Sequence, residues 1–202
     1  MAAIDRLVRA VSSLLSLEEV CRTAAHQLGQ TLNSDAVVIF VREGNDLRLM
    51  ASTCGPKIHP TEIEAVQRAC ESIGGRSVTA KQPVYVANIL KDPRCTQQEC
   101  RNAGLHAYAS IPLSLDDQLI GLLVVASATE RDFSLSAGYF ETAADQIATT
   151  IRNVQRLDEA RGYASQLQQT ITEFKRAEEA LLLNARCRER FILKVMYGYR
   201  AT

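Results

Sequence analysis

Residues 110–127, SIPLSLDDQLIGLLVVAS, hold two apolar runs on either side of the polar triplet Asp116-Asp117-Gln118. Apolar runs of this length that are bounded by turn-forming residues are typical of buried strands. We therefore predict a hairpin with strands at residues 108–115 and 119–127. Because both strands are apolar along nearly their whole length, we expect both of them in the centre of a sheet.

A second hairpin is predicted earlier in the chain. Residues 36–41 form a continuous run rich in β-branched side chains, and residues 47–52 form an alternating segment. Between them, Glu43-Gly44-Asn45-Asp46 has the composition of a tight turn. Because strands joined by a tight turn run antiparallel, the two hairpins together indicate an antiparallel sheet.

Amphipathic helices are expected on the N-terminal side of each hairpin. Residues 4–15 and 17–32 carry apolar side chains at helical spacing, and Ser16 with Glu19 forms a capping box before the second of these helices. Residues 61–73 repeat the helical pattern. The whole order predicts the α+β class, with a central antiparallel sheet of five to six strands and helices on both of its faces.

The segment between the hairpins is predicted to be less regular. We expect short extended pieces at residues 77–80 and 84–86, followed by a long irregular connection at residues 88–104. Long connections inside compact domains are often functional.

A long helix is predicted after Ser134, which we expect to cap it. Apolar residues at helical spacing begin the helix and continue into a seam with alternating intervals of three and four, which is typical of a coiled coil. The first set is Phe140, Ala144, Ile147, Ile151 and Val154, and the seam is Leu157, Ala160, Ala164, Leu167, Ile171, Phe174 and Leu181. Glu178 interrupts the seam, and an extra interval of three beside Leu157 breaks the heptad phase.

Composition excludes several classes of protein. The 23 Lys and Arg residues balance 23 Asp and Glu residues, so the chain lacks the basic surface that nucleic-acid binding requires. The longest nearly uncharged apolar stretch, residues 119–128, is too short to span a bilayer, so we expect no membrane insertion. Charged residues interrupt the N-terminal apolar positions, so no signal peptide is expected and a cytoplasmic location is predicted.

The cysteines leave three interpretations open. Cys95 and Cys100 stand in the heptapeptide RCTQQEC, and Cys54 follows a predicted strand. The pair is incidental, or forms a redox couple, or ligates a metal that Cys70 or His106 would help to hold. A structural zinc site normally needs four ligands, so we assign no metal site.

Several stretches resemble GAF domains. The hairpin SIPLSLDDQLIGLLVVAS is similar to the most recognisable part of that family. LEEVCRTAAHQL looks like its first helix, DAVVIFVREGNDLRLMAS its first hairpin, and FSLSAGYFETAADQIATTIRNV its last helix. The resemblance covers residues 1–157, and the following TITEFKRAEEALLL is similar to helical connectors in bacterial signalling proteins. We therefore expect a sensor domain at residues 1–157 and a coiled-coil linker at residues 158–202.

The resemblance implies a pocket for a small molecule on one face of the sheet, with the terminal helices packed on the other face. The expected covers of this pocket are the helix at residues 61–73 and the connection at residues 88–104. The identity of the ligand and of any cofactor is left open. The candidate site residues are Cys54, Cys95, Cys100, His106, Ile111, Leu113, Leu123 and Val125.

Some GAF proteins are enzymes that reduce free methionine sulfoxide, which implies an alternative function. Cys100 stands twelve residues before Pro112, as one cysteine of those enzymes does, but SIGGRSVTA lacks their other cysteine. Bilin-binding members often carry a cysteine immediately before a histidine, whereas Leu105 precedes His106 here. We therefore assign no catalytic residue.

The sequence thus predicts a regulatory module of a two-component or related signalling system. Ligand binding or thiol chemistry at the pocket is expected to change the packing of helices in a homodimer, which then controls an effector domain. A purely structural dimerisation domain is the remaining alternative. Any signal is expected to pass through Phe140, Ile147, Ile151 and Val154, which lie on the helix that continues into the seam.

Overall fold

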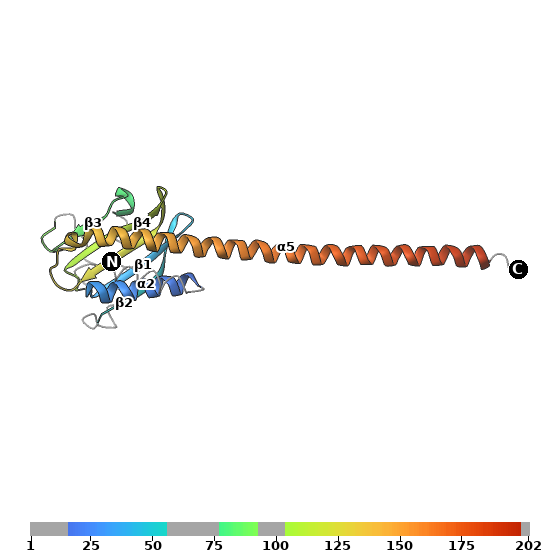
Figure 1. The fold of residues 1–202 in the computed structure, drawn as a ribbon, viewed down its shortest axis with the longest axis horizontal. Helices are drawn as coiled ribbons and strands as arrows, with labels where there is room; N and C mark the ends of the chain where they lie inside the picture. The colour runs from blue at the N-terminus through green and yellow to red at the C-terminus, as the bar shows by residue number, and fades with distance from the viewer. Residues whose placement is uncertain (1–15, 56–76, 93–103, 199–202) are drawn as a thin grey trace. The chain divides into compact units, whose positions relative to one another are not determined.

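The computed structural model describes residues 16–55, 77–92 and 104–198 (Figure 1). The predicted helices at residues 4–15 and 61–73 lie outside these residues, as does most of the predicted connection at residues 88–104. The chain divides into two compact units, Met1–Gln155 and Arg156–Thr202. The described elements are α2 (Leu17–Leu32), β1 (Ala36–Glu43), β2 (Asp46–Cys54), β3 (Val84–Val86), β4 (Ala107–Leu115), β5 (Gln118–Ser127), the short 3-10 helix η2 (Phe133–Ser136) and α5 (Ala137–Gly198).

The described strands form one antiparallel sheet in the order β2-β1-β5-β4-β3. The sheet confirms the predicted fold class, and the interior positions of β4 and β5 confirm that both strands of the second hairpin are central. Asp116 and Asp117 close this hairpin with φ angles of 49° and 60°. Two consecutive positive φ angles are typical of the type I′ turn, whose twist matches that of the paired strands.

Gly121 lets β1 and β5 approach each other closely. A Cβ atom at this position would collide with the carbonyl oxygen of Phe40. Next to it, the register of β4 and β5 shifts by one residue, because Leu113 pairs with Gly121 whereas Ser114 pairs with Leu119. A bulge of this kind redirects the side chains beyond it.

One face of the sheet is packed by α2 and the first part of α5, which Figure 1 shows running along the same side. The helix residues are buried together with alternate residues of the strands, as the strand period of two requires. The helix residues at the centre of this cluster are Val20, Ala24, Leu28, Phe140, Ile147 and Ile151.

The other face of the sheet carries a smaller apolar cluster. Half-buried side chains such as Leu47, Leu49 and Val78 border it. Its buried members are Ala36, Val38, Phe40, Val86, Ile89, Leu105, Tyr108, Leu122, Val124 and Ala126.

Local predictions at α2 are confirmed. The Ser16 side chain accepts a hydrogen bond of 3.2 Å from the backbone N–H of Glu19, as the capping box predicts. The helix ends at Asn33, which adopts the left-handed conformation and donates its N–H to the last carbonyl groups.

Two local predictions are wrong. Residues 77–80 are helical rather than extended, because the N–H groups of Lys81 and Gln82 bond back to Val78 and Ser77. Ser134 is also not the cap of the long helix that was expected after it. Asp132 accepts from the Ser134 N–H at 2.9 Å and starts η2, so α5 begins only at Ala137.

The second unit consists of the later part of α5. From Arg156 to Leu181 the side chains are exposed, although several of them are large and apolar. These include Leu157, Tyr163, Leu167, Ile171, Phe174 and Leu181, each at least 54% exposed. Among the described residues no helix has both the length and the apolar character that a bilayer span requires.

Candidate functional site

The four sheet residues expected in the pocket face the helices instead. Ile111, Leu113, Leu123 and Val125 are buried in the cluster that packs on α2 and α5. The structure differs from the expectation because β5 is apolar on both sides, so its hydrophobicity did not reveal which alternate set faces which layer. In β4 the available signal was Ser110, which alternates with the apolar Ala109 and Ile111. The side chains that face the other side of the sheet here belong to Ser110, Leu122 and Val124.

The other candidate residues are not brought together by the described structure. Cys54 ends β2 and is half-buried beside the smaller apolar cluster, where burial raises the pKa of its thiol above the ordinary value. His106 precedes β4, and its backbone bonds to Ile89 and Ser127 at 2.7 and 2.8 Å. β1 and β5 separate their strands in the sheet. Cys95 and Cys100 lie outside the described residues.

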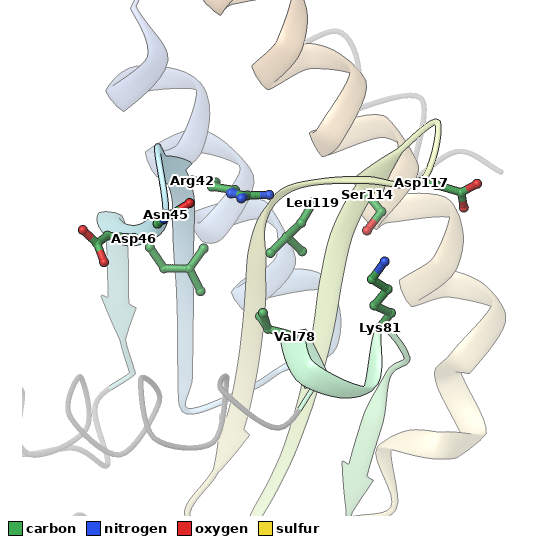
Figure 2. A pocket seen from close by; sticks show the side chains of 9 residues that line it. Arg42, Asn45, Asp46, Val78, Lys81, Ser114, Asp117 and Leu119 are labelled. Carbon is green, nitrogen blue, oxygen red and sulfur yellow. The ribbon is translucent and has the colours of Figure 1, made fainter.

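A pocket of about 400 Å³ lies at one end of the sheet (Figure 2). It is formed by the end of β1, the start of β2, the turn between β4 and β5, and the helical turn at residues 77–80. Two of its walls, Leu47 and Val78, also border the smaller apolar cluster. Its lining residues are Arg42, Asn45, Asp46, Leu47, Val78, Lys81, Ser114, Asp117 and Leu119.

Local backbone structure positions the two cations of this pocket. Arg42 follows Val38 and Phe40 on the same side of β1, and its Nε donates a 2.8 Å hydrogen bond to the carbonyl oxygen of Gly44. Lys81 has a φ of 51° and ends the helical turn that begins at residue 77. That turn is fixed to the sheet by a buried hydrogen bond of 2.7 Å between the hydroxyl groups of Ser77 and Ser110.

The charges of the pocket are not paired with one another. Figure 2 shows Arg42 and Lys81 extending toward the middle of the pocket, while the carboxylates of Asp46 and Asp117 point away from them. Within the described parts of the chain, none of the ion pairs includes Arg42 or Lys81. Two cationic groups therefore line this pocket, and no carboxylate of the described residues pairs with either of them.

A second hollow of about 350 Å³ connects the same region to α5. Arg42 and Leu119 line both hollows, and the second also includes Arg152 of α5. Arg152 donates a 2.7 Å hydrogen bond to the side-chain oxygen of Gln118, the first residue of β5 after the turn. The start of β5, next to the turn that borders the pocket, is therefore bonded directly to the helix.

The opposite end of the sheet is closed by hydrogen bonds. The Asp35 carboxylate accepts from the Ser127 hydroxyl at 3.0 Å and from the Ala128 N–H at 2.9 Å. Arg131 donates to the carbonyl oxygen of Leu32 at 2.6 Å, and its guanidinium lies 5.0 Å from the centre of the Phe133 ring. These polar groups join the end of α2 and the residues before β1 to the end of β5.

Sequence reasoning missed Arg42 and Lys81 as site residues. The available signal at Arg42 was its strand phase, because it continues the side of β1 that carries Val38 and Phe40. Lys81 carried no such signal, since its position depends on the helical turn at residues 77–80 that was predicted to be extended.

The five-stranded sheet, with helices on one face and a pocket at the end of the other, defines a domain of the α+β class. The family model described as GAF domain matches residues 16–151, so the chain belongs to the GAF domain family. No curated protein matches the chain.

Solved structures of GAF domains and related proteins share this fold. The GAF domain of an Acinetobacter phosphoenolpyruvate-protein phosphotransferase is 17% identical, with a TM-score of 0.62 over 78% of this chain and 96% of that chain. A methyl-accepting chemotaxis protein is 17% identical, with a TM-score of 0.59 over 75% of this chain and 98% of that one. The free methionine-R-sulfoxide reductase of Neisseria meningitidis is 15% identical, with a TM-score of 0.57 over 77% and 89%. At these identities the likeness concerns the fold alone.

Proposed function

We propose that this chain is a regulatory sensor module. A small molecule binds in the GAF domain, and its presence is passed along α5 to the paired helices of a homodimer. One observation carries the proposal: α5 is a continuous helix that is buried against the sheet at Phe140, Ile147, Ile151 and Val154 and carries exposed apolar residues after Arg156. The same helix therefore belongs both to the sensing domain and to the proposed output.

The exposed residues of α5 support a second copy of this chain as the partner. Leu167, Ile171, Phe174 and Leu181 border a shallow, mainly apolar groove along one side of the helix. Their spacing of three and four residues matches a coiled-coil seam, in which the same stripe of a second helix removes the apolar side chains from water. We propose that this seam, together with residues 4–15, which the sequence predicts to be an amphipathic helix, forms a parallel homodimer.

The change of phase beside Leu157 supports a switch in this helix pair. Val154 is buried against the sheet and Leu157 is 58% exposed, only three residues later. An extra interval of three overwinds a coiled coil locally, which allows two registers of similar packing. Ligand binding would favour one of these registers, and an effector domain would respond to the change.

The setting of the module is part of the proposal. We propose a cytoplasmic signalling protein of the two-component type or a related system, consistent with the fold shared with a methyl-accepting chemotaxis protein. The enzyme alternative depends on Cys95 and Cys100, outside the described residues. Cys54 does not support it, because a raised thiol pKa lowers the fraction of reactive thiolate. Turnover of free methionine sulfoxide with a thiol reductant would favour the enzyme.

The oligomeric state tests the seam. Leu167→Glu combined with Ile171→Glu is expected to shift the protein from dimer to monomer at micromolar concentration, because it places charges in the seam. Light scattering after size-exclusion chromatography measures the mass. Gln169→Glu is the matched control, since Gln169 is exposed on the other side of the helix. A wild-type monomer, or equal dissociation of the control, would contradict the proposal.

A further inference from the structure

We infer that the pocket at the end of the sheet binds the anionic group, a phosphate or a carboxylate, of a small organic molecule between Arg42 and Lys81. The inference rests on the proposed sensing function and names the ligand class of that pocket. Both cations line the same cavity of about 400 Å³, although they are 39 residues apart in the chain. Pockets of this size hold small metabolites.

The cations are available to a ligand. In the described part of the chain neither is engaged in an ion pair, and the two carboxylates of the lining point away from them in Figure 2. Two like charges on one cavity repel each other, and a bound anion removes this repulsion while it forms charge-assisted hydrogen bonds. The geometry therefore favours an anion over a neutral or cationic ligand.

Hydrogen bonds of the folded chain fix Arg42 and the helical turn that carries Lys81 before a ligand binds. The Nε of Arg42 is held by Gly44, which leaves its terminal nitrogens for a ligand. Lys81 extends from a helical turn that the buried Ser77–Ser110 hydrogen bond fixes to the sheet. Because less conformational freedom is lost on binding, such preorganisation increases affinity.

The other residues that line the pocket indicate the chemistry of the rest of the ligand. Leu47, Val78 and Leu119 provide an apolar side, while Asn45 and Ser114 provide groups that donate or accept hydrogen bonds. A molecule with a short apolar body and a single anionic end fits this combination. Inorganic phosphate alone would contact only the cationic part, whereas hexanoate would also contact the apolar side.

The test is titration of the full chain with inorganic phosphate and, separately, with hexanoate, at constant ionic strength and against sodium chloride. Amide chemical shifts in NMR spectra report binding at Val78, Lys81 and Leu119. Removing both cations with Arg42→Gln and Lys81→Gln is expected to weaken binding of both probes by about tenfold or more. Tighter binding of hexanoate than of phosphate is expected from its contact with the apolar side, whereas tighter binding of inorganic phosphate would indicate a ligand with a phosphate group.

Matched variants make the test decisive. Arg22→Gln with Lys91→Gln removes the same charge from exposed sites outside the pocket and is expected to change affinity by less than about twofold. Lys81→Arg is expected to retain binding. Equal weakening by the control, or shifts no larger than those with chloride, overturns the inference. Neither result affects the seam test above, so a dimeric sensor with a different ligand remains distinguishable.

Discussion

The two faces of the sheet differ in how they are covered. On the helix face, Leu28, Leu123 and Phe140 have no exposed surface and belong to one cluster of buried side chains from the helices and the sheet. On the other face, Phe40, Tyr108 and Val124 are equally buried, but at one end of the sheet Leu47 and Val78 are only half-buried and border a pocket lined by Arg42 and Lys81. The comparison shows that both faces are packed in their middle, and that the other face leaves a pocket with two cationic side chains only at one end.

The largest difference between the faces is expected from truncating one leucine on each. Leu123→Ala should lower the free energy of unfolding by about 2–5 kcal/mol, because it leaves a cavity among packed side chains. Leu119→Ala should lower the free energy of unfolding clearly less, because Leu119 is a half-buried residue that lines the pocket. Urea unfolding at equal protein concentration measures both, and equal losses would contradict the comparison.

Glycine substitutions test the close approach of the central strands. Gly121→Ala should destabilise the domain by about 1–3 kcal/mol, since its Cβ meets the backbone of Phe40. Gly138→Ala is the control, because a Cβ there meets nothing within 4 Å and alanine favours the helix. The midpoint temperature of thermal unfolding should fall for Gly121→Ala and rise for Gly138→Ala. A tolerated Gly121→Ala would mean that β1 and β5 are farther apart.

The burial of Cys21 on the helix face predicts that the free energy of unfolding depends on pH in the alkaline range. Burial raises the pKa of Cys21 from 9.0 to about 12. The unfolded chain therefore releases this proton first, and the free energy of unfolding falls by about 1.4 kcal/mol per pH unit between pH 9 and 12. Cys21→Ala should remove this part of the slope in urea unfolding measured from pH 8 to 10.5. An unchanged slope would show that Cys21 is not buried as described.

The smallest effect is expected at exposed ion pairs. Arg22 pairs with Glu18 at 2.9 Å and Lys91 with Glu130 at 3.5 Å, all with side chains more than half exposed. Arg22→Gln and Lys91→Gln should leave the unfolding midpoint nearly unchanged, because solvent and salt screen such pairs. A large loss of stability would disqualify this variant as the control for anion binding.

Local sequence rules predicted most of the fold. The capping box at Ser16, the turn at Asp116-Asp117 and the apolar runs of β4 and β5 each depend on neighbouring residues, and the structure agrees with all three. The helical turn at residues 77–80 was missed, because its hydrogen bond from Ser77 to Ser110 joins residues 33 apart in sequence.

The candidate site was harder to predict than the fold. Ile111 and Leu123 were expected in the pocket, yet both face the helices. β5 is apolar on both faces, so its composition gives no indication of which alternate residues face the helices. Arg42 and Lys81 meet only through the folded backbone, so no motif joins them in the sequence. Charges that converge on a cavity are a tertiary property.

Crosslinking across the α5 pair tests the sensor proposal most directly. Single cysteines replace Asn153, Asp158 or Arg161, and Cys187→Ser removes an exposed native thiol of the same helix. A bismaleimide crosslinks each variant with and without hexanoate, once NMR has established that the pocket is occupied. The account predicts a change of about fivefold or more in the crosslinking rate at one or more positions, and none when Arg42→Gln and Lys81→Gln are present. Unchanged rates at all three positions with the pocket occupied would contradict it.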